Sequence, residues 1–265
     1  STHDWLLFFT NQGRVYRAKV HELPDAGRDA RGQHVANLLA FKPDENIASV
    51  ISIADYSSLP HLVIATKGGI IKKSPLTEYD SPRTGGLIAI TLKDGDEVVA
   101  ASAITSKNEI LLISKKGMSL RFTADDESLR PMGRSATGVI GMKFRSGDEL
   151  LTMASVGSGD KANFVLTATD GGFGKRTNLD EYRTQGRGGI GVKAAKVDED
   201  SRGGLVGALV VNEKDEILVI TSGGVVMRTP VKEVRETGRD TLGVRLVNLD
   251  QGTHVVSLAK VSDDE

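Results

Sequence analysis

Residues 163–196 read NFVLTATDGGFGKRTNLDEYRTQGRGGIGVKAAK: an apolar run, a glycine turn, a second run ending in Lys-Arg, and a basic, glycine-rich segment. The same plan occurs five times in the 265-residue chain. In every copy a Ser or Thr stands three positions before a turn glycine, and an Arg or Lys stands four positions after it. The turn glycines are Gly13, Gly69, Gly117, Gly172 and Gly224. Their spacings of 56, 48, 55 and 52 residues are typical of solenoids, propellers and similar repeat arrays.

A second glycine fixes the register of the repeat. It follows the turn glycine by 19, 17, 21, 19 and 19 residues, at Gly32, Gly86, Gly138, Gly191 and Gly243. Four positions before it stand Arg28, Pro82, Arg134, Arg187 and Arg239. Two anchors at matched offsets predict five repeats, at about residues 4–60, 61–108, 109–162, 163–215 and 216–261, in one domain that covers residues 1–265.

Each repeat holds four short apolar runs, which predict four strands. The first is continuous, as in a strand covered on both faces: 5–9, 62–65, 110–113, 164–166 and 217–220. The second becomes polar at its end: 15–19, 70–73, 118–122, 173–177 and 225–229. The third follows the second glycine: 35–41, 87–92, 139–144, 190–195 and 244–249. The fourth follows an acidic turn: 47–53, 98–104, 150–156, 205–211 and 255–261.

These elements predict an all-β fold of propeller-like, four-stranded blades, with about twenty strands in total. A single helical turn at most is expected after the second strand. Ser74-Pro75 and Thr229-Pro230 suit the cap and first position of such a turn, because Ser and Thr accept a backbone N–H and Pro loses no bond there.

Composition narrows the class of protein. No apolar run approaches the roughly 18 residues of a membrane helix, and no secretory signal precedes Trp5. The chain has no Cys, which excludes disulfides and thiolate metal sites and fits a reducing cytoplasm. The net charge is −1, from 34 Lys and Arg against 35 Asp and Glu. The bases cluster at the first hairpin and before the second glycine, and the acids cluster in the later turns, so charge is segregated by repeat position.

The glycine-rich segment of the fourth repeat does not predict nucleotide binding. Residues 186–191 match G-x-G-x-x-G, but they precede a strand where a dinucleotide site needs a helix. Residues 172–176 lack the first glycine and the Ser/Thr of a phosphate-binding loop. The histidines never stand at metal-ligand spacing, and no nucleophile elbow occurs. The sequence therefore predicts a non-catalytic domain without metal or cofactor.

The segment Gln185-Gly-Arg-Gly-Gly-Ile-Gly191 resembles the box motif Q-R-R-G-G-K-G of the C-terminal domain family of DNA gyrase A. The surrounding repeats resemble that family's β-pinwheel over essentially the whole chain. Gln185, Arg187, Gly188, Gly189 and Gly191 match the box, whereas Gly186 replaces an Arg and Ile190 replaces a Lys. This copy of the box is therefore two charges short.

The position of the box differs from the family pattern. The family carries its full box in the first blade, and this chain has its best copy in the fourth repeat. We expect either that a first blade precedes Ser1 in a longer parent chain, giving six blades, or that the box has moved.

The resemblance implies a function in DNA topology. Such a domain wraps duplex DNA around a basic outer rim, which lets the parent, an ATP-dependent type II topoisomerase, introduce negative supercoils. The implied partners are duplex DNA, the rest of gyrase A and, through it, gyrase B in an A2B2 assembly. The isolated domain is expected to be monomeric, without membrane contact, and to act in the bacterial cytoplasm at the nucleoid.

Recurring bases suit this role, since Lys and Arg release counterions from the duplex and a long bend needs contacts on several blades. Glycines at 188 and 189 would let backbone amides approach a phosphate closely. The predicted DNA contacts are the box residues together with Arg17, Lys72, Lys73, Lys115, Lys116, Arg121, Lys175, Arg176, Arg183, Arg187, Lys193, Arg228, Arg239 and Arg245.

Other interpretations remain open at this stage. The base four positions after the turn glycine could instead bridge acids of a neighbouring blade, and the box could be a turn that staples adjacent blades. The chain could also be the C-terminal domain of topoisomerase IV, or a protein-binding propeller scaffold. A scaffold would expose an apolar patch and show no salt-dependent affinity for DNA.

Overall fold

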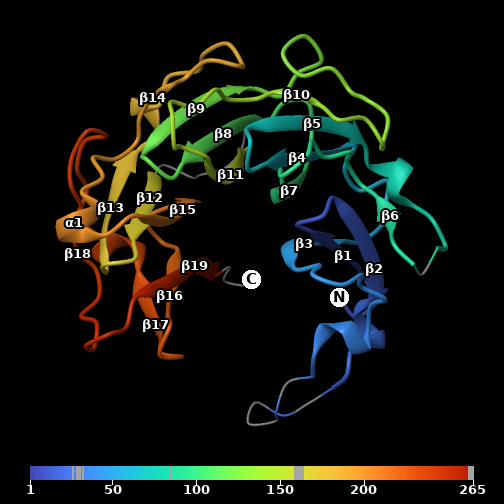
Figure 1. Cartoon of the computed structure of the whole chain (residues 1–265), viewed down its shortest axis with the longest axis horizontal. Helices are drawn as coiled ribbons and strands as arrows, with labels where there is room; N and C mark the ends of the chain where they lie inside the picture. The colour runs from blue at the N-terminus through green and yellow to red at the C-terminus, as the bar shows by residue number, and fades with distance from the viewer. Residues whose placement is uncertain (26, 28–30, 32, 84, 158–163, 262–265) are drawn as a thin grey trace. The chain divides into compact units, whose positions relative to one another are not determined.

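The structure, a computed structural model, describes residues 1–25, 27, 31, 33–83, 85–157 and 164–261 (Figure 1). Two of the repeat anchors, Arg28 and Gly32, lie outside the described residues. The described chain consists of short β-strands with brief 3-10 turns and one α-helix of four residues, α1 (Glu199–Arg202). The all-β prediction is therefore confirmed. Among these residues, no helix has the length and apolar character needed to cross a membrane.

The chain divides into two compact units. The first comprises Ser1–Ser106 and Ala124–Ile140, and the second comprises Lys107–Thr123 and Gly141–Glu265. The third repeat contributes to both. The single domain over residues 1–265 stays a prediction.

The strands follow the predicted runs closely, except for the third run of each repeat. The first unit contains β1 (Trp5–Thr10), β2 (Arg14–Lys19), β3 (Ile47–Ile53), β4 (His61–Thr66), β5 (Ile70–Pro75), β6 (Leu87–Ile88), β7 (Val98–Ile104) and β10 (Val139–Ile140). The second contains β8 (Glu109–Ser114), β9 (Met118–Thr123), β11 (Leu150–Val156), β12 (Phe164–Thr169), β13 (Phe173–Asn178), β14 (Val192–Lys193), β15 (Leu205–Val211), β16 (Glu216–Thr221), β17 (Val226–Pro230), β18 (Val244–Arg245) and β19 (Val255–Val261).

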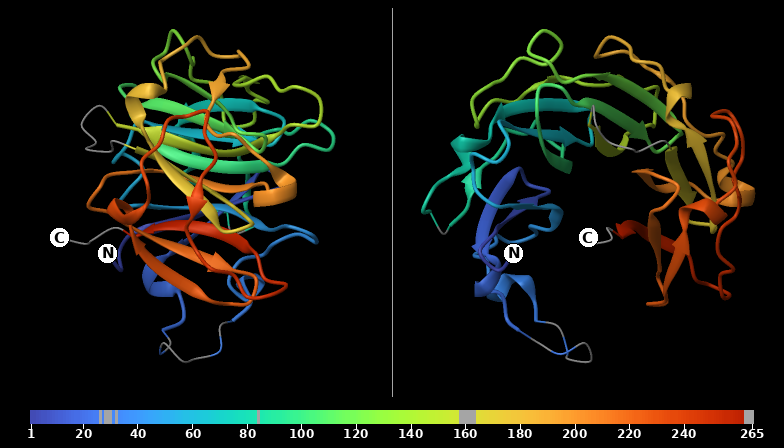
Figure 2. Two further views of the ribbon diagram at one scale, coloured as in Figure 1. Left: turned by 90° about the vertical axis from the view of Figure 1, so that its left-hand side faces the viewer. Right: turned by 180° about the vertical axis from the view of Figure 1, so that it is seen from behind.

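Neighbouring repeats exchange a strand. The sheets run β3-β1-β2-β6, β10-β5-β4-β7, β11-β8-β9-β14 and β15-β12-β13-β18. In each, three strands come from one repeat, and the fourth is the third strand of the next repeat. Figure 2 shows the same sheets from two further sides. The fifth sheet, β17-β16-β19, has three strands among the described residues. The four strands of one repeat therefore do not all lie in the same sheet.

The exchanged strand explains the turn glycines. All five have positive φ, between 74° and 80°, which glycine adopts without steric cost. At Gly117 an added Cβ would lie 2.5 Å from the carbonyl oxygen of Ala195. The Gly117 carbonyl also accepts the N–H of Ala194 at 2.7 Å. The turn therefore needs glycine both for its own backbone and to seat the chain that arrives from the following repeat.

The third strands are only two residues long, shorter than predicted. Each pairs with the second strand of the preceding repeat, for example Val192 with Ser119 and Lys193 with Met118. In the first repeat the predicted strand 35–41 does not form, and Val35–Asn37 is a 3-10 turn instead. In the other repeats this strand pairs with the second strand of the repeat before it. Its formation therefore depends on that pairing and not on apolar patterning alone.

The recurring Ser or Thr three positions before each turn glycine has a bonding role. Its hydroxyl accepts the N–H of the residue that follows the glycine, at 3.2 Å for Thr66 and 3.0 Å for Ser114. The same hydroxyls donate to acids of the later turn, to Asp96 at 2.6 Å and to Asp148 at 2.7 Å. The carboxylates of these turn acids therefore stabilise the hairpin through hydrogen bonds.

A 3-10 turn follows the second strand in four of the repeats, at Val20–Glu22, Leu76–Tyr79, Leu179–Glu181 and Val231–Glu233. This confirms the predicted single helical turn. The predicted caps are displaced by one residue, because Pro75 and Pro230 occupy the N-cap position and make no side-chain cap hydrogen bond.

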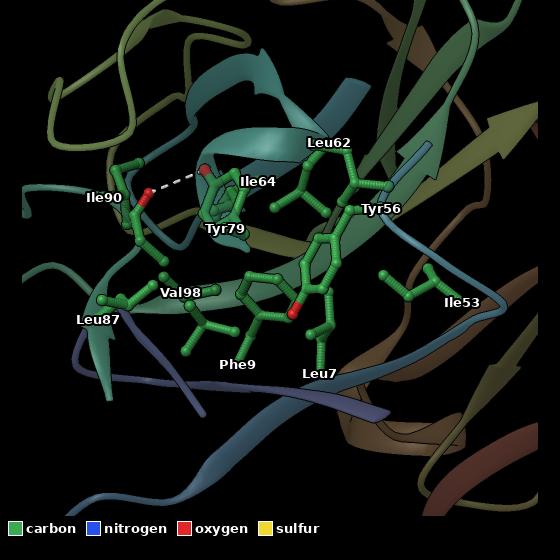
Figure 3. Close-up of a cluster of buried hydrophobic side chains, with 13 residues drawn as sticks. Leu7, Phe9, Ile53, Tyr56, Leu62, Ile64, Tyr79, Leu87, Ile90 and Val98 are labelled. Carbon is green, nitrogen blue, oxygen red and sulfur yellow. Dashed lines mark hydrogen bonds between the residues drawn. The ribbon is translucent and has the colours of Figure 1, made fainter. Parts of the chain in front are cut away.

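The core of the first unit lies between its two sheets. Leu7 and Phe9 of β1 face Leu62 and Ile64 of β4, with Tyr79 beside them (Figure 3). All four residues from Leu62 to Ala65 are fully buried, as the continuous first run predicts for a strand covered on both faces. The second unit has corresponding clusters, around Leu111 and Val165 and around Leu166 and Val219.

Candidate nucleic-acid interface

The base four positions after the turn glycine is ion-paired in every repeat. The nitrogen–oxygen distances are 2.8 Å for Arg17–Asp80, 2.8 Å for Lys73–Asp126 and 3.0 Å for Arg176–Glu213, and Arg121 pairs with Glu109 and Arg228 with Glu216. The hydrogen bond from Lys73 also lowers the pKa of Asp126. This position is therefore primarily an ion-pairing site.

In the first three repeats this base holds the loop of the following repeat. Arg17 reaches Asp80, and Lys73 Nζ donates to the carbonyl of Ala124 at 2.6 Å as well as to Asp126. Arg121 donates to the carbonyls of Leu179 at 3.0 Å and Tyr182 at 3.2 Å. The interpretation that these bases bridge acids of a neighbouring blade, left open by the sequence, describes the contacts of Arg17 and Lys73. Arg121 reaches the next repeat through carbonyls, and its acid, Glu109, belongs to its own repeat.

Two further lysines, Lys72 and Lys175, are fully buried in backbone cages. Lys72 Nζ donates to the carbonyls of Ala89 and Arg134. Lys175 Nζ donates to the carbonyls of Gly238, at 2.7 Å, and Arg239. Burial penalises the charged form and lowers the pKa of each lysine to about 8. Each ammonium group thus ties the second strand of one repeat to the loop of the next.

Four of the predicted DNA contacts are poorly placed for that role. Lys72, Lys73, Lys175 and Arg176 are buried, and their charged groups are bonded to protein atoms. A phosphate cannot reach a buried cation without displacing these bonds, so DNA contact by these four residues stays a prediction that their geometry does not support. Arg17 and Arg121 are exposed by only 19% and 15%, and they are occupied by the contacts described above.

Six of the remaining predicted cations are exposed, so a phosphate could reach them, and all six belong to the second unit. They are Lys115, Lys116, Arg183, Lys193, Arg228 and Arg245. Lys193 and Arg245 end the exchanged strands β14 and β18. The guanidinium of Arg245 lies 4.5 Å from the ring centre of Phe173. Cation–π contact of this kind holds an exposed guanidinium in place while leaving its N–H groups available.

Several of these cations are partly neutralised. Lys115 pairs with Glu149 at 2.5 Å, and Lys193 with Asp240 at 3.1 Å. Exposed pairs of this type contribute only about 0–1 kcal/mol to stability, so they are weak competitors for a phosphate.

The arginine four positions before the second glycine acts as a staple in the third and fifth repeats. Arg134 donates to the carbonyl of Ile88 on β6, and Arg239 donates to the carbonyl of Lys193 on β14 at 2.7 Å. Their own carbonyls accept the buried lysines, and their N–H groups donate to Glu78 and Glu181. The side chain of Arg239 is therefore engaged in holding two repeats together.

The box segment 185–191 is bonded on both sides. Gln185 N–H donates to the carbonyl of Arg121 at 2.8 Å, and an added Cβ at Gly191 would lie 2.0 Å from the carbonyl oxygen of Ser119. Gly188, with φ of +81°, donates to the carbonyl of Gly141 at 2.8 Å. The box thus links β9 and the 141–143 segment of the third repeat to the fourth repeat, which is the stapling role. Arg187 is half-buried and has an interaction partner in the protein.

Two features of this region were missed from the sequence. The acids Glu78 and Glu181 stand nine positions after the turn glycine, where every repeat has an acid, whereas the buried lysines occur only in the second and fourth repeats; this alternation of the lysines was the available signal. Lys143 was also missed, although its N–H donates to the carbonyl of Gly189 in the box at 2.9 Å.

The fold and the site together define a β-repeat protein of the pinwheel class, in which a blade receives a strand from the next repeat. A family profile described as the DNA gyrase C-terminal domain, β-propeller, matches residues 4–54, 60–105, 108–156, 163–212 and 215–262. The chain belongs to this DNA gyrase C-terminal domain family. The resemblance and the fold class predicted from the sequence are confirmed.

The similar proteins agree with this assignment. The chain is 63% identical to the DNA gyrase A protein of Streptomyces coelicolor over 98% of its length, and 52% identical to that of Mycolicibacterium smegmatis over 100%. It spans 30% and 31% of those proteins. It also resembles a solved gyrase A C-terminal domain, with a TM-score of 0.85 and 29% identity, over 98% of this chain and 83% of that one. A topoisomerase IV C-terminal domain matches with a TM-score of 0.86 and 29% identity, over 98% and 80%.

Proposed function

We propose that this chain is the DNA-wrapping part of a gyrase A protein: it binds duplex DNA without sequence preference and bends it along the exchanged-strand edges of its sheets. The observation that carries the proposal is the family match in all five repeats. The exposed cations on and near these edges supply the chemistry.

Six of the predicted cations stay exposed, and these six support electrostatic binding. Each Lys or Arg that neutralises a phosphate releases counterions, which favours association irrespective of base sequence. Bending 20–30 base pairs by 40–90° costs on the order of 1–6 kcal/mol, so a wrap needs contacts spread over several repeats. Lys115, Lys193 and Arg245 lie in three successive repeats, which suits that requirement.

The parent protein extends the proposal. We place the chain within gyrase A, assembled with gyrase B as A2B2 in an ATP-dependent type II topoisomerase that introduces negative supercoils in the bacterial cytoplasm at the nucleoid. This chain contributes no catalytic group or cofactor, and it acts as one monomeric domain. Breakage, rejoining and ATP hydrolysis take place elsewhere in the parent.

The topoisomerase IV alternative receives support from one structural match of equal quality. Full-length relatives with 52–63% identity over nearly the whole chain are gyrase A proteins, so we favour gyrase. A protein-binding scaffold fits less well, since it does not account for this kinship.

A salt titration tests the proposal. The affinity of the chain for a linear duplex of mixed sequence is measured at increasing salt. Six phosphate contacts, at about 0.9 each, predict that log K falls with log salt with a slope of about −5, and eight predict about −7. A flat response, or a strong preference for one short sequence, would contradict DNA wrapping.

A further inference from the structure

The box of the fourth repeat is joined to a segment of the third repeat that carries two bases. Gly188 N–H donates to the carbonyl of Gly141 at 2.8 Å, and Lys143 N–H donates to the carbonyl of Gly189 at 2.9 Å. These two bonds align residues 141–143 against residues 188–189. The backbone of Lys143 is therefore fixed beside the box turn.

The side chains of this segment alternate between the interior and the surface. Met142 is buried at 1% exposure, Phe144 is half-buried, and Lys143 and Arg145 are exposed. In an extended chain, alternate residues point to opposite sides. Since the side chain of Met142 points into the core, those of Lys143 and Arg145 share the outward side.

The acids that follow these bases are engaged by the preceding hairpin. The carboxylate of Asp148 accepts the hydroxyl of Ser114 at 2.7 Å and the N–H of Lys116 at 2.9 Å. Glu149 pairs with Lys115. Both acids of this turn are therefore bonded to the β8–β9 hairpin, and Glu149 is paired with a lysine there.

The pair of bases is particular to this repeat. The positions five and seven after the second glycine are Thr91 and Lys93 in the second repeat, Lys196 and Asp198 in the fourth, and Asn248 and Asp250 in the fifth. Only the third repeat has a base at both, and it is the repeat whose segment is bonded to the box. The box itself lacks two charges, at Gly186 and Ile190.

We propose that Lys143 and Arg145 form a phosphate-binding site for duplex DNA at this joint and replace the two charges that the box has lost. The site rests on the proposed function, and it adds two contacts that the box motif does not contain. The DNA backbone at this point is held by bases of the third repeat, and the box turn positions them.

The first experiment removes the two bases. In the double variant Lys143→Gln/Arg145→Gln, the salt slope of duplex affinity should become less steep by about 2, since each phosphate contact contributes about 1. The thermal midpoint should not change, because the segment's bonds to the box are made by backbone atoms. Lys93→Gln is the matched control. It removes an exposed lysine at the position equivalent to Arg145, beside Asp94, and should leave the slope unchanged.

The second experiment tests replacement of the missing box charges. A Cβ at Gly186 would meet no atom within 4 Å, and Ile190 is 41% exposed, so Gly186→Arg and Ile190→Lys fit the fold. Added to the double variant, they should restore the wild-type slope. Gln251→Lys with His254→Lys adds equal charge at an exposed turn of the fifth repeat and should not restore it.

The outcomes separate this inference from the proposed function. A steep wild-type slope that the double variant leaves unchanged would overturn the site while preserving DNA wrapping. Equal restoration by the fifth-repeat lysines would show that net charge matters and the joint does not, and would also overturn it. A flat wild-type slope would contradict the proposed function itself.

Discussion

The sheet of β12, β13, β15 and β18 and the sheet of β16, β17 and β19 are built from equivalent hairpins, but only the first receives an exchanged strand among the described residues. In the first, the carbonyl of Gly172 accepts the N–H groups of Leu246 and Val247 at 2.9 and 3.1 Å, and the side chain of Arg176 is 10% exposed. In the second, the equivalent Arg228 is 56% exposed, and Val226 of β17 is 54% exposed.

The difference shows what decides the role of a repeated base. The two hairpins have the same Thr, Gly and Arg at the same offsets. Arg176 is almost buried because the loop of the next repeat pairs with its backbone, and Arg228 is open to solvent because no such cover is present in the part of the chain that the structure describes. The neighbouring repeat therefore determines whether this base is covered or open to solvent.

The largest expected effect comes from a methyl group at the turn glycine. Gly172→Ala should lower the free energy of unfolding by roughly 2–5 kcal/mol: about 1–2 for an L-residue at positive φ, and about 1–3 for crowding, since the new Cβ would lie 2.8 Å from the Val247 carbonyl oxygen. Gly224→Ala should lose only the first part, because nothing lies within 4 Å. Urea unfolding of both variants measures the difference. Equal losses would show that the segment after β18, which contains Val247, does not press on the turn.

The second prediction concerns the buried lysine of the four-stranded sheet. Lys175→Met should cost about 2 kcal/mol at neutral pH, because the carbonyl of Arg239 loses the lysine donor and the carbonyl of Gly238 keeps only the hydroxyl of Thr241. The equivalent residue in the three-stranded sheet is already Met227, and Met227→Leu serves as the control. A loss no larger than the control's would mean that water satisfies these carbonyls.

The same lysine gives a pH dependence whose sign can be stated. Burial lowers the folded pKa to about 8 from the usual 10.5, so between these values the unfolded chain binds more protons, and the free energy of unfolding rises with pH. Lys72 contributes in the same direction. Above pH 10 the rise should be opposed, because the pKa values of Tyr79 and Tyr182 are raised to about 12. Subtracting the Lys175→Met curve from the wild-type curve isolates the lysine, and a difference that is flat from pH 8 to 10 would contradict its burial.

Much of the fold could be predicted because its signals are local. The turn glycines, the Ser or Thr before them and the continuous first runs each depend on a few neighbouring residues, and the first, second and fourth strands formed close to the predicted ranges. Strand exchange could not be predicted. The length and polarity of β18 would suit a strand of its own blade as well as a strand of the preceding blade. The sequence pattern does not decide between them, because pairing depends on which strands lie close together in three dimensions.

The site was harder to predict for the same reason. Lys175 and Arg176 have the charge and spacing of phosphate contacts, and nothing in their own repeat shows that residues about 60 positions later supply carbonyls to Lys175 and cover both. Lys143 was missed because its relation to the box is a backbone hydrogen bond between repeats. The box motif and the repeats around it pointed to the family and to the kind of chemistry, and burial shows which members of each repeated set are open to solvent.

The third prediction separates stability from DNA binding. Arg176→Ala should cost roughly 1–2 kcal/mol, since Arg176 lies 4.5 Å above the Phe164 ring and pairs with Glu213, and it should leave the salt slope unchanged. Arg228→Ala should change stability by less than about 1 kcal/mol and make the slope less steep by about 1. Unfolding and salt titration of both variants provide the test. If Arg176→Ala also altered the slope in a folded protein, the exposure difference would not explain the roles of the two bases.

The smallest effect concerns how the exchanged strand presents its own base. Arg245 of β18 lies over one side of Phe173, and Arg202 lies 4.8 Å from the same ring. In the hairpin of the three-stranded sheet, the residue equivalent to Phe173 is Val225. Phe173→Leu keeps both arginines but removes the ring that orients Arg245, a contact of about 0.5–1 kcal/mol at an exposed site. We expect a stability loss below about 1 kcal/mol and a severalfold weaker affinity for DNA, with the salt slope unchanged because no charge is lost. Val225→Leu should change neither quantity. Unchanged affinity in Phe173→Leu would mean that Arg245 finds its phosphate without the ring, and a less steep slope would mean that Arg245 no longer reaches the DNA at all.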